Sequence, residues 1–123
     1  MRDNKEWKKN FLERLLKFAV KIIILANKLP KTAAGFAIAT QLIKAGTSIG
    51  ANAEEAQDAS SMRDFIQKLS ISLREAKETR YWLKVIKEAK LLDANLVNKE
   101  LIECEEVIAL LTASVKSSKL KLI

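Results

Sequence analysis

The chain has 123 residues and carries 22 Lys and Arg against 15 Asp and Glu, a formal net charge of +7. Its length suits one domain with a single hydrophobic core and is short for two. Hydrophobic residues make up 49% of the chain, yet three Gly and one Pro supply little turn material for a many-stranded sheet. A mostly helical domain is therefore expected. The absence of His excludes Ser-His-Asp and Cys-His catalysis and the Glu-x-x-His ligands of di-iron bundles.

The sequence also indicates the cellular compartment in which the protein is expected. The single cysteine, Cys104, cannot form an intramolecular disulfide, and no basic segment precedes an uninterrupted apolar stretch like that of a secretory signal. The longest uncharged run, residues 32–43, has twelve residues, whereas roughly 20 are needed to cross a bilayer. We therefore expect a cytoplasmic protein without a membrane span.

The first helix is predicted over about residues 4–29. Asp3 and Glu6 have the spacing of a capping box, with Asp in place of Ser or Thr, and Pro30 ends the helix. Apolar residues alternate at spacings of four and three, the pattern of one buried face: Phe11, Leu15, Phe18, Ile22, Leu25 and Leu29. On a helical wheel the stripe broadens to about half the circumference through Leu12, Leu16, Ala19 and Ile23.

The second helix is predicted over about residues 33–57. Thr32 is its candidate N-cap, and the polar stretch around Asp58, Ser60 and Ser61 ends it. Its inward positions follow helical spacing: Ile38, Leu42, Ala45, Ile49 and Ala53.

Two of the three glycines, Gly46 and Gly50, lie inside this second helix. Their spacing does not match a phosphate-binding loop, and no strand precedes them. With Ala39 and Ala53 they form a ridge of small residues, so we interpret the ridge as a seam for close packing of a neighbouring helix. Ser48 and Asn52 lie on the other flank, where we expect hydrogen bonds to the third helix or to another subunit.

The third helix is predicted over about residues 62–89, with Ser61 and Asp64 as a second capping box. One apolar face is expected to point inward: Met62, Phe65, Leu69, Leu73, Ala76 and Leu83. A second patch lies roughly opposite this face: Ile71, Trp82, Val85 and Ile86. Arg80 falls within the inward stripe, so either a carboxylate of the second helix pairs with it or its guanidinium extends out to solvent.

The fourth helix is predicted over about residues 94–118, with Asp93 as its cap. Its inward residues keep the alternation of four and three: Val97, Leu101, Cys104, Ile108, Leu111 and Val115. Cys104 is thus expected to be a small buried hydrophobe rather than a reactive thiol. Short connections between long helices force antiparallel neighbours, which predicts an all-α, up-down-up-down four-helix bundle as a single domain over residues 1–123.

Two basic flanks are candidates for phosphate binding, because cations recur on them at helical intervals. The first helix contributes Arg14, Lys17, Lys21 and Lys28, and the third contributes Arg63, Arg74, Lys77 and Lys84. No aromatic-interleaved platform or base-reading motif accompanies this charge. A first helix lying on a membrane is disfavoured, because its apolar stripe is needed to complete the bundle.

Catalysis finds little support in the sequence. Carboxylates that could supply oxygen ligands to a metal occur in two pairs, Glu54 with Glu55 and Glu75 with Glu78, but such pairs are common on solvated helices. We expect no enzyme activity, metal, cofactor or small-molecule substrate.

The extra apolar patches indicate self-association, unless Trp82 merely lies flat on the surface. The residues expected to serve helix packing or oligomer contacts are Gly46, Ser48, Gly50, Asn52, Glu75, Glu78, Arg80 and Trp82.

The stretch GTSIGANAEEAQDASSMRDFIQKLSISLREAKETRYWL, residues 46–83, resembles a known family. It is similar to the small four-helix bundle proteins first noted as open reading frames in intervening sequences of bacterial 23S ribosomal RNA genes. The likeness is carried by TSIGAN, the acidic residue after it, Asp64-Phe65 and the E-x-x-E-T-x-Y-W-L motif of residues 75–83. This chain departs from relatives at Ala53, where Ile is usual, and lacks a Gly after Glu55.

The resemblance implies a left-handed antiparallel bundle that assembles as a homopentamer with a central channel, and it implies no catalysis. A more distant relative is the accessory protein of diversity-generating retroelements, which is pentameric and basic and works with a reverse transcriptase and nucleic acid. Two hypotheses follow. The first is an oligomeric adaptor that binds RNA or DNA through basic helix faces; the alternative is a purely structural or protein-binding module.

Overall fold

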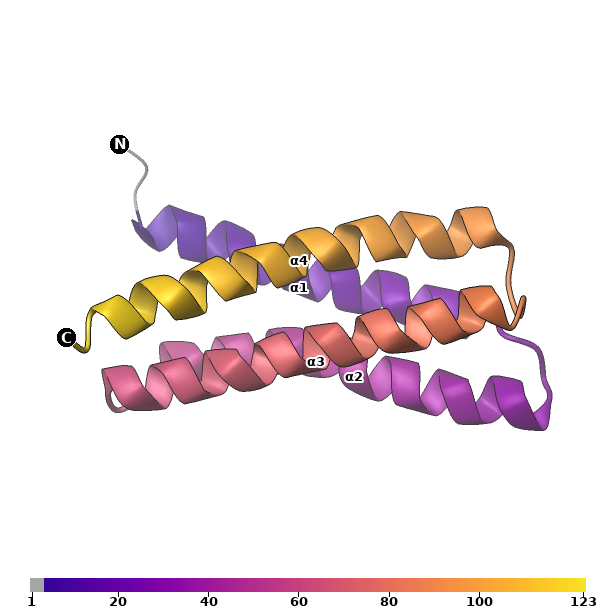
Figure 1. The fold of residues 1–123 in the computed structure, drawn as a ribbon, viewed down its shortest axis with the longest axis horizontal. Helices are drawn as coiled ribbons and strands as arrows, with labels where there is room; N and C mark the ends of the chain where they lie inside the picture. Colours follow the sequence, from indigo (N-terminus) through magenta and orange to yellow (C-terminus); the bar gives the residue numbers. More distant parts are fainter. Residues whose placement is uncertain (1–3) are drawn as a thin grey trace.

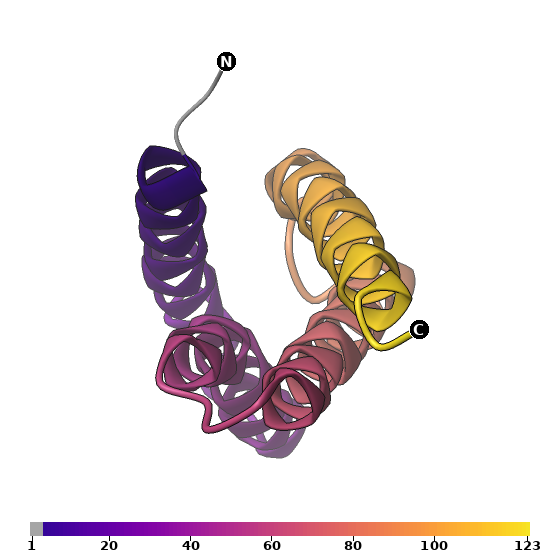
Figure 2. The ribbon, with the colours of Figure 1, turned by 90° about the vertical axis from the view of Figure 1, so that its left-hand side faces the viewer.

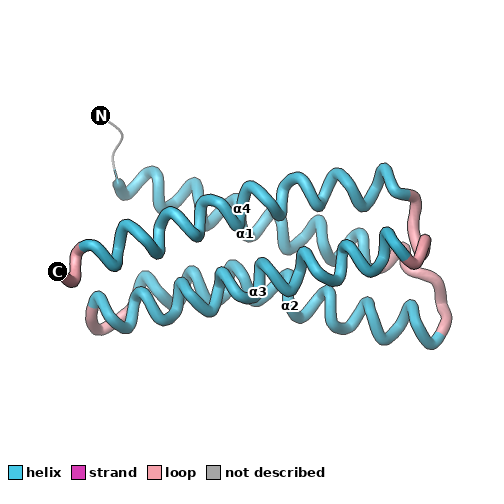
Figure 3. Tube along the Cα trace, viewed as in Figure 1, coloured by secondary structure: helices cyan, strands magenta, loops and turns pink. Residues whose placement is uncertain are grey.

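The computed structural model describes residues 4–123, which form four helices joined by short loops (Figures 1 and 3). The helices are α1 (Asn4–Ala26), α2 (Ala33–Gln57), α3 (Met62–Glu88) and α4 (Ala94–Leu120). No strand occurs within these residues. Successive helices run antiparallel, which confirms the predicted all-α, up-down-up-down four-helix bundle. Seen end-on in Figure 2, α2 and α3 lie side by side, and α1 and α4 make the fewest contacts of the neighbouring pairs.

Side chains cap the starts of α2, α3 and α4 as predicted. The Thr32 hydroxyl accepts a hydrogen bond from the backbone N–H of Gly35 at 3.1 Å, and Asp93 accepts one from Asn95 at 2.9 Å. Ser61 accepts from the N–H of Asp64 at 3.1 Å. The Asp64 carboxylate in turn accepts from the N–H of Ser60 at 3.2 Å, one residue further back than in a standard capping box. The capping box predicted at Asp3 lies outside the described residues.

Helix α1 ends at Ala26, three residues before the predicted end. Residues 27–29 continue as a tight turn, in which the N–H groups of Lys28 and Leu29 donate to carbonyls three residues back. Pro30 keeps the chain from continuing as a helix beyond this turn, because it disfavours helical backbone at Leu29 and has no N–H to donate to a preceding carbonyl. At the start of α2, a Cβ on residue 35 would collide with the Pro30 carbonyl, so this turn requires Gly35.

The inward faces predicted for α1, α2 and α4 are confirmed. All six inward residues predicted for the first helix are buried, including Leu29 in the turn after α1. Those of α2 and α4 are buried apart from the half-buried Ile38 and Leu101. Helix α4 also runs two residues beyond its predicted end, to Leu120. These faces form one continuous hydrophobic core.

The face predicted for α3 was partly wrong. Ile66 is buried near its start, and from residue 69 on the buried positions alternate at spacings of three and four, the spacing of a left-handed bundle: Leu69, Ser72, Ala76, Thr79, Leu83 and Ile86. Met62, Phe65 and Leu73 are half-buried at its edge, and Ile86 is fully buried instead of lying in an outer patch. A pattern search for apolar residues missed Ser72 and Thr79. Both can be buried because their hydroxyls donate to carbonyls of Ile49 and Glu75, at 2.7 and 2.8 Å.

The glycine ridge of α2 packs against α1, as the sequence predicts. A Cβ on Gly46 would lie 2.7 Å from Cγ2 of Ile22, and one on Gly50 would lie 3.4 Å from Cβ of Leu15. The hydrogen bonds expected from Ser48 and Asn52 to α3 are not formed. Both side chains donate within α2, to the carbonyls of Lys44 at 2.6 Å and Ser48 at 2.8 Å, because a serine or asparagine in a helix readily bonds the preceding turn.

Replacing Gly46 with Leu is expected to destabilise the protein by roughly 1–3 kcal/mol, because the side chain must displace Ile22 in a packed core. Gly50→Ala is the matched control. Its methyl group meets Leu15 at an ordinary distance and removes a helix-propensity cost of up to about 1 kcal/mol. Urea denaturation would measure both. Equal stability of the Gly46→Leu variant and the parent chain would contradict this account of the seam.

Candidate nucleic-acid interface

Two of the four basic residues predicted on α1, Arg14 and Lys21, lie near acids of α4. Arg14 makes a bidentate pair with Glu103 of α4, with both N–O distances at 2.8 Å, and a longer contact of 3.6 Å to Glu106. The hydrogen bond from Arg14 lowers the pKa of Glu103 below its ordinary value. The charge of Arg14 is therefore largely neutralised by an ion pair that links α1 to α4.

A buried acid lies at the same α1–α4 seam. Glu100 is 8% exposed, and burial raises the pKa of its carboxyl, while Lys21 and Lys99 act in the opposite direction. Lys21 thus lies near the carboxylates of Glu100 and Glu103. Lys17 and Lys28 are exposed and have no ion-pair partner among residues 4–123.

The basic residues predicted on α3 are placed differently. All four are exposed, and none has an ion-pair partner within the described part of the chain: Arg63, Arg74, Lys77 and Lys84. Arg74 and Lys77 line a shallow groove between α3 and α4, and Lys119 of α4 joins them there. Lys119 could not be recognised as a site residue from the sequence, because it is a single lysine near the end of α4 and only the antiparallel packing brings it beside α3.

An aromatic ring lies among these cations. Tyr81 is 58% exposed and follows Lys77 by four residues and precedes Lys84 by three, so the three share one helix face. Its ring meets Trp82 edge-on, with 5.1 Å between centroids and 71° between planes. Tyr81 was not among the predicted site residues, although its spacing from Lys77 and Lys84 can be found in the sequence.

The remaining predicted packing residues are divided among several roles. Arg80 pairs with Glu105 of α4 at 2.9 Å, so the expected partner on α2 was wrong: Arg80 lies on the flank of α3 that faces α4.

Glu75 is half-buried and Glu78 is exposed. Burial, and to a smaller extent repulsion from Glu78, raises the pKa of the Glu75 carboxyl. Trp82 packs against the core instead of lying on the surface, and its buried Nε1 has no hydrogen-bond partner within residues 4–123.

Cys104 is confirmed as a buried core residue. Its Sγ donates to the carbonyl of Ala76 at 3.3 Å, and burial raises the pKa of the thiol to about 12. A thiol with this pKa carries almost no thiolate at neutral pH, so it is a poor nucleophile.

The described residues offer neither a metal site nor a membrane span. Within residues 4–123, no three His, Cys, Asp or Glu side chains lie close enough together to hold a metal ion. Glu54 and Glu55 are exposed on α2. None of the four described helices has the length and apolarity needed to span a bilayer.

The fold and surface define a small, basic, antiparallel four-helix bundle. Over residues 3–113 the chain matches the model of the 23S rRNA-intervening sequence protein family, and it belongs to that family. It is also similar to a crystal structure of a protein of unknown function from the S23 ribosomal protein family of Bacteroides thetaiotaomicron VPI-5482. The two are 36% identical with a TM-score of 0.81, and the match covers 86% of this chain and 98% of that chain. No curated protein matches the chain.

The buried carboxyl of Glu100 gives a pH-dependent prediction. Because its pKa in the folded state is raised, the charged form costs stability above that pKa, and the cost disappears as the pH falls through it. We expect Glu100→Gln to raise the melting temperature at pH 7 by roughly 2–4 °C and to have little effect near pH 4. Calorimetry at both pH values, with exposed Glu88→Gln as control, measures the difference. An equal gain at both would show that ionisation of Glu100 is not the cause.

Proposed function

We propose that this protein is a non-enzymatic, oligomeric four-helix bundle of the cytoplasm that binds RNA or DNA and acts as an adaptor for RNA-related machinery. The observation that carries the proposal is the convergence of Arg74, Lys77 and Lys119 from two helices on one groove, without ion-pair partners within residues 4–123. Cations in such an array attract phosphates and release counterions when they bind. Arg63 and Lys84 extend the array along α3.

The exposed ring of Tyr81 favours single-stranded over double-stranded nucleic acid as the ligand of this face. An exposed ring beside cations can stack on an unpaired base, whereas the bases of a duplex are already stacked. Tyr81 lies between Lys77 and Lys84, so a strand following these cations would bring a base over its ring. The basic residues of α1 are secondary in this proposal, because Arg14 already pairs with Glu103.

We further propose that the chain assembles as a homopentamer, the state that its family resemblance implies. An exposed apolar face on α1 supports self-association: Leu16, Val20 and Ile24 are 64%, 49% and 52% exposed, respectively. Contiguous apolar surface of this kind usually marks an interface. Assembly would also repeat the basic face of α3 around the oligomer and so strengthen binding to a long strand.

Nucleic-acid binding is tested by replacing Arg74, Lys77 and Lys119 together with Gln. We expect the triple variant to lose at least tenfold in affinity for single-stranded RNA at low salt, and the slope of log K against log salt to become shallower by about 2, since each lost phosphate contact contributes about 0.7. Filter binding over a salt series measures both quantities, and Tyr81→Ala is expected to weaken single-strand binding more than duplex binding.

The matched control removes the same charge elsewhere, through Lys9→Gln, Lys31→Gln and Lys99→Gln at exposed positions. If this control loses as much affinity as the triple variant, net charge rather than the α3–α4 face is responsible. No retention of RNA or DNA by the parent chain at low salt would favour the structural or protein-binding module instead.

Self-association is tested by Leu16→Gln with Val20→Gln. We expect light scattering to give the mass of about five chains for the parent protein, and a smaller mass for the double variant, because polar side chains remove the apolar contact area. The control is Leu96→Gln with Ile102→Gln, which changes two exposed apolar residues of α4. A parent protein that is monomeric at every concentration would contradict the proposal.

A further inference from the structure

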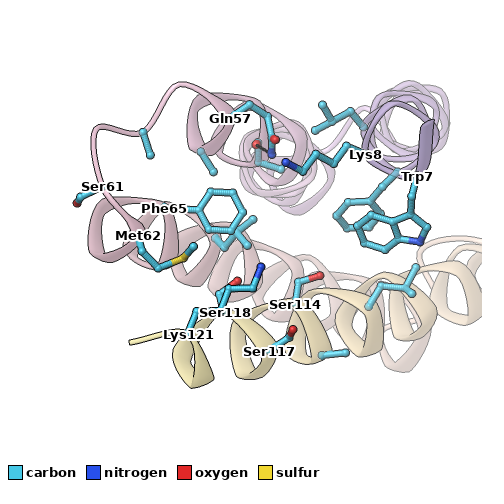
Figure 4. A pocket seen from close by; sticks show the side chains of 18 residues that line it. Trp7, Lys8, Gln57, Ser61, Met62, Phe65, Ser114, Ser117, Ser118 and Lys121 are labelled. Carbon is cyan, nitrogen blue, oxygen red and sulfur yellow. Dashed lines mark hydrogen bonds between the residues drawn. The ribbon is translucent and has the colours of Figure 1, made fainter. Parts of the chain in front are cut away.

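A groove opens at the end of the bundle where α1 begins and α4 ends (Figure 4). Its volume is about 620 Å³, within the range of small-molecule sites, and all four helices contribute to it. The groove exists because α4 presents small residues, Ala113, Ser114 and Ser117, where α1 presents Trp7 and Phe11. The two rings stack with 5.4 Å between centroids and form one rigid apolar wall.

The groove is lined by apolar residues and by two lysines. The interior is apolar, with Phe11, Phe65 and Leu69 among its residues, whereas Lys8 of α1 and Lys121 after α4 bring positive charge. In Figure 4 the Lys8 side chain extends into the groove. No carboxylate lines the groove, and neither lysine has an ion-pair partner within the described chain. The groove therefore complements a molecule with an apolar body and a negative charge.

A serine also lines the groove. Ser118 of α4 is 6% exposed as a residue and lies three residues before Lys121 in sequence. A serine hydroxyl can donate a hydrogen bond, so Ser118 can add a donor for an acceptor group of a bound molecule to the two lysines.

We propose that this groove is a binding site for a small acidic amphiphile, a carboxylic acid with an unbranched apolar chain of the fatty-acid type. Its carboxylate lies between Lys8 and Lys121 and accepts a hydrogen bond from Ser118, and its chain lies on Phe11, Phe65 and Leu69. The sequence alone gave no reason to expect such a ligand, because these residues come from distant parts of the chain. The site lies apart from the basic face of α3, so its occupation is independent of nucleic-acid binding.

The proposal is tested by calorimetric titration of the full-length protein with decanoate and with decylamine, which share a chain and differ in charge. We expect decanoate to bind at least tenfold more tightly. In Lys8→Gln with Lys121→Gln, decanoate affinity falls about tenfold, as two partly exposed ion pairs would predict, while decylamine affinity rises. Lys9→Gln with Lys116→Gln is the control, since both lysines lie outside the groove and the net charge changes equally.

A second variant tests the cavity itself. Ser114→Leu fills the groove and is expected to weaken decanoate without changing the helical circular dichroism. The proposal is overturned if decanoate does not bind at about 1 mM, if both pairs of lysine variants behave alike, or if Ser114→Leu leaves decanoate affinity unchanged. It is also overturned if light scattering shows that decanoate dissociates the oligomer, because a second copy of the chain would then be the occupant.

Discussion

The close approach of α1 to α2 at Gly46 fixes the arrangement of this bundle. Ile22 occupies the space where residue 46 would otherwise carry a side chain, so α1 is held against α2 across its apolar stripe. On the other side of α2, the hydroxyl of Ser72 donates to the carbonyl of Ile49 and links α3 to α2. Small and hydrogen-bonded residues therefore permit close packing on both flanks of α2.

The fourth side of the bundle is held differently. Between α1 and α4 the main specific contact is the Arg14–Glu103 pair, beside the buried carboxyl of Glu100. A partly exposed ion pair stabilises by at most about 1 kcal/mol, much less than a packed apolar seam. The weak α1–α4 side also explains the groove, since small residues on the last turns of α4 leave space beside Trp7. Fold and groove thus share one cause: α1 is packed closely on one side only.

Much of this fold was predictable from the sequence. The caps at Thr32, Ser61 and Asp93 depend on local spacing, and the stripes of α1, α2 and α4 depend on helical period. The face of α3 was harder, because two of its buried positions are hydroxyl residues. Ser72 and Thr79 look like surface residues until their acceptor carbonyls are known. A three-four pattern that admits Ser and Thr beside Leu69 and Ala76 would have found the correct face.

The candidate site was less predictable, because the accessible charge depends on which acids meet which bases. Helix α4 supplies Glu103 to Arg14 of α1 and Glu105 to Arg80 of α3, pairs separated by 89 and 25 residues in sequence. Because Arg14 and Arg80 are paired in this way, their charge is largely neutralised and contributes little to a binding surface. The cations that remain unpaired among residues 4–123 include those on the outer row of α3, beside Lys119. A net charge of +7 by itself defines no interface. The acids of α4 pair with Arg14 of α1 and Arg80 of α3, whereas Lys17 and Lys28 of α1 and the four exposed cations of α3 have no ion-pair partner among residues 4–123.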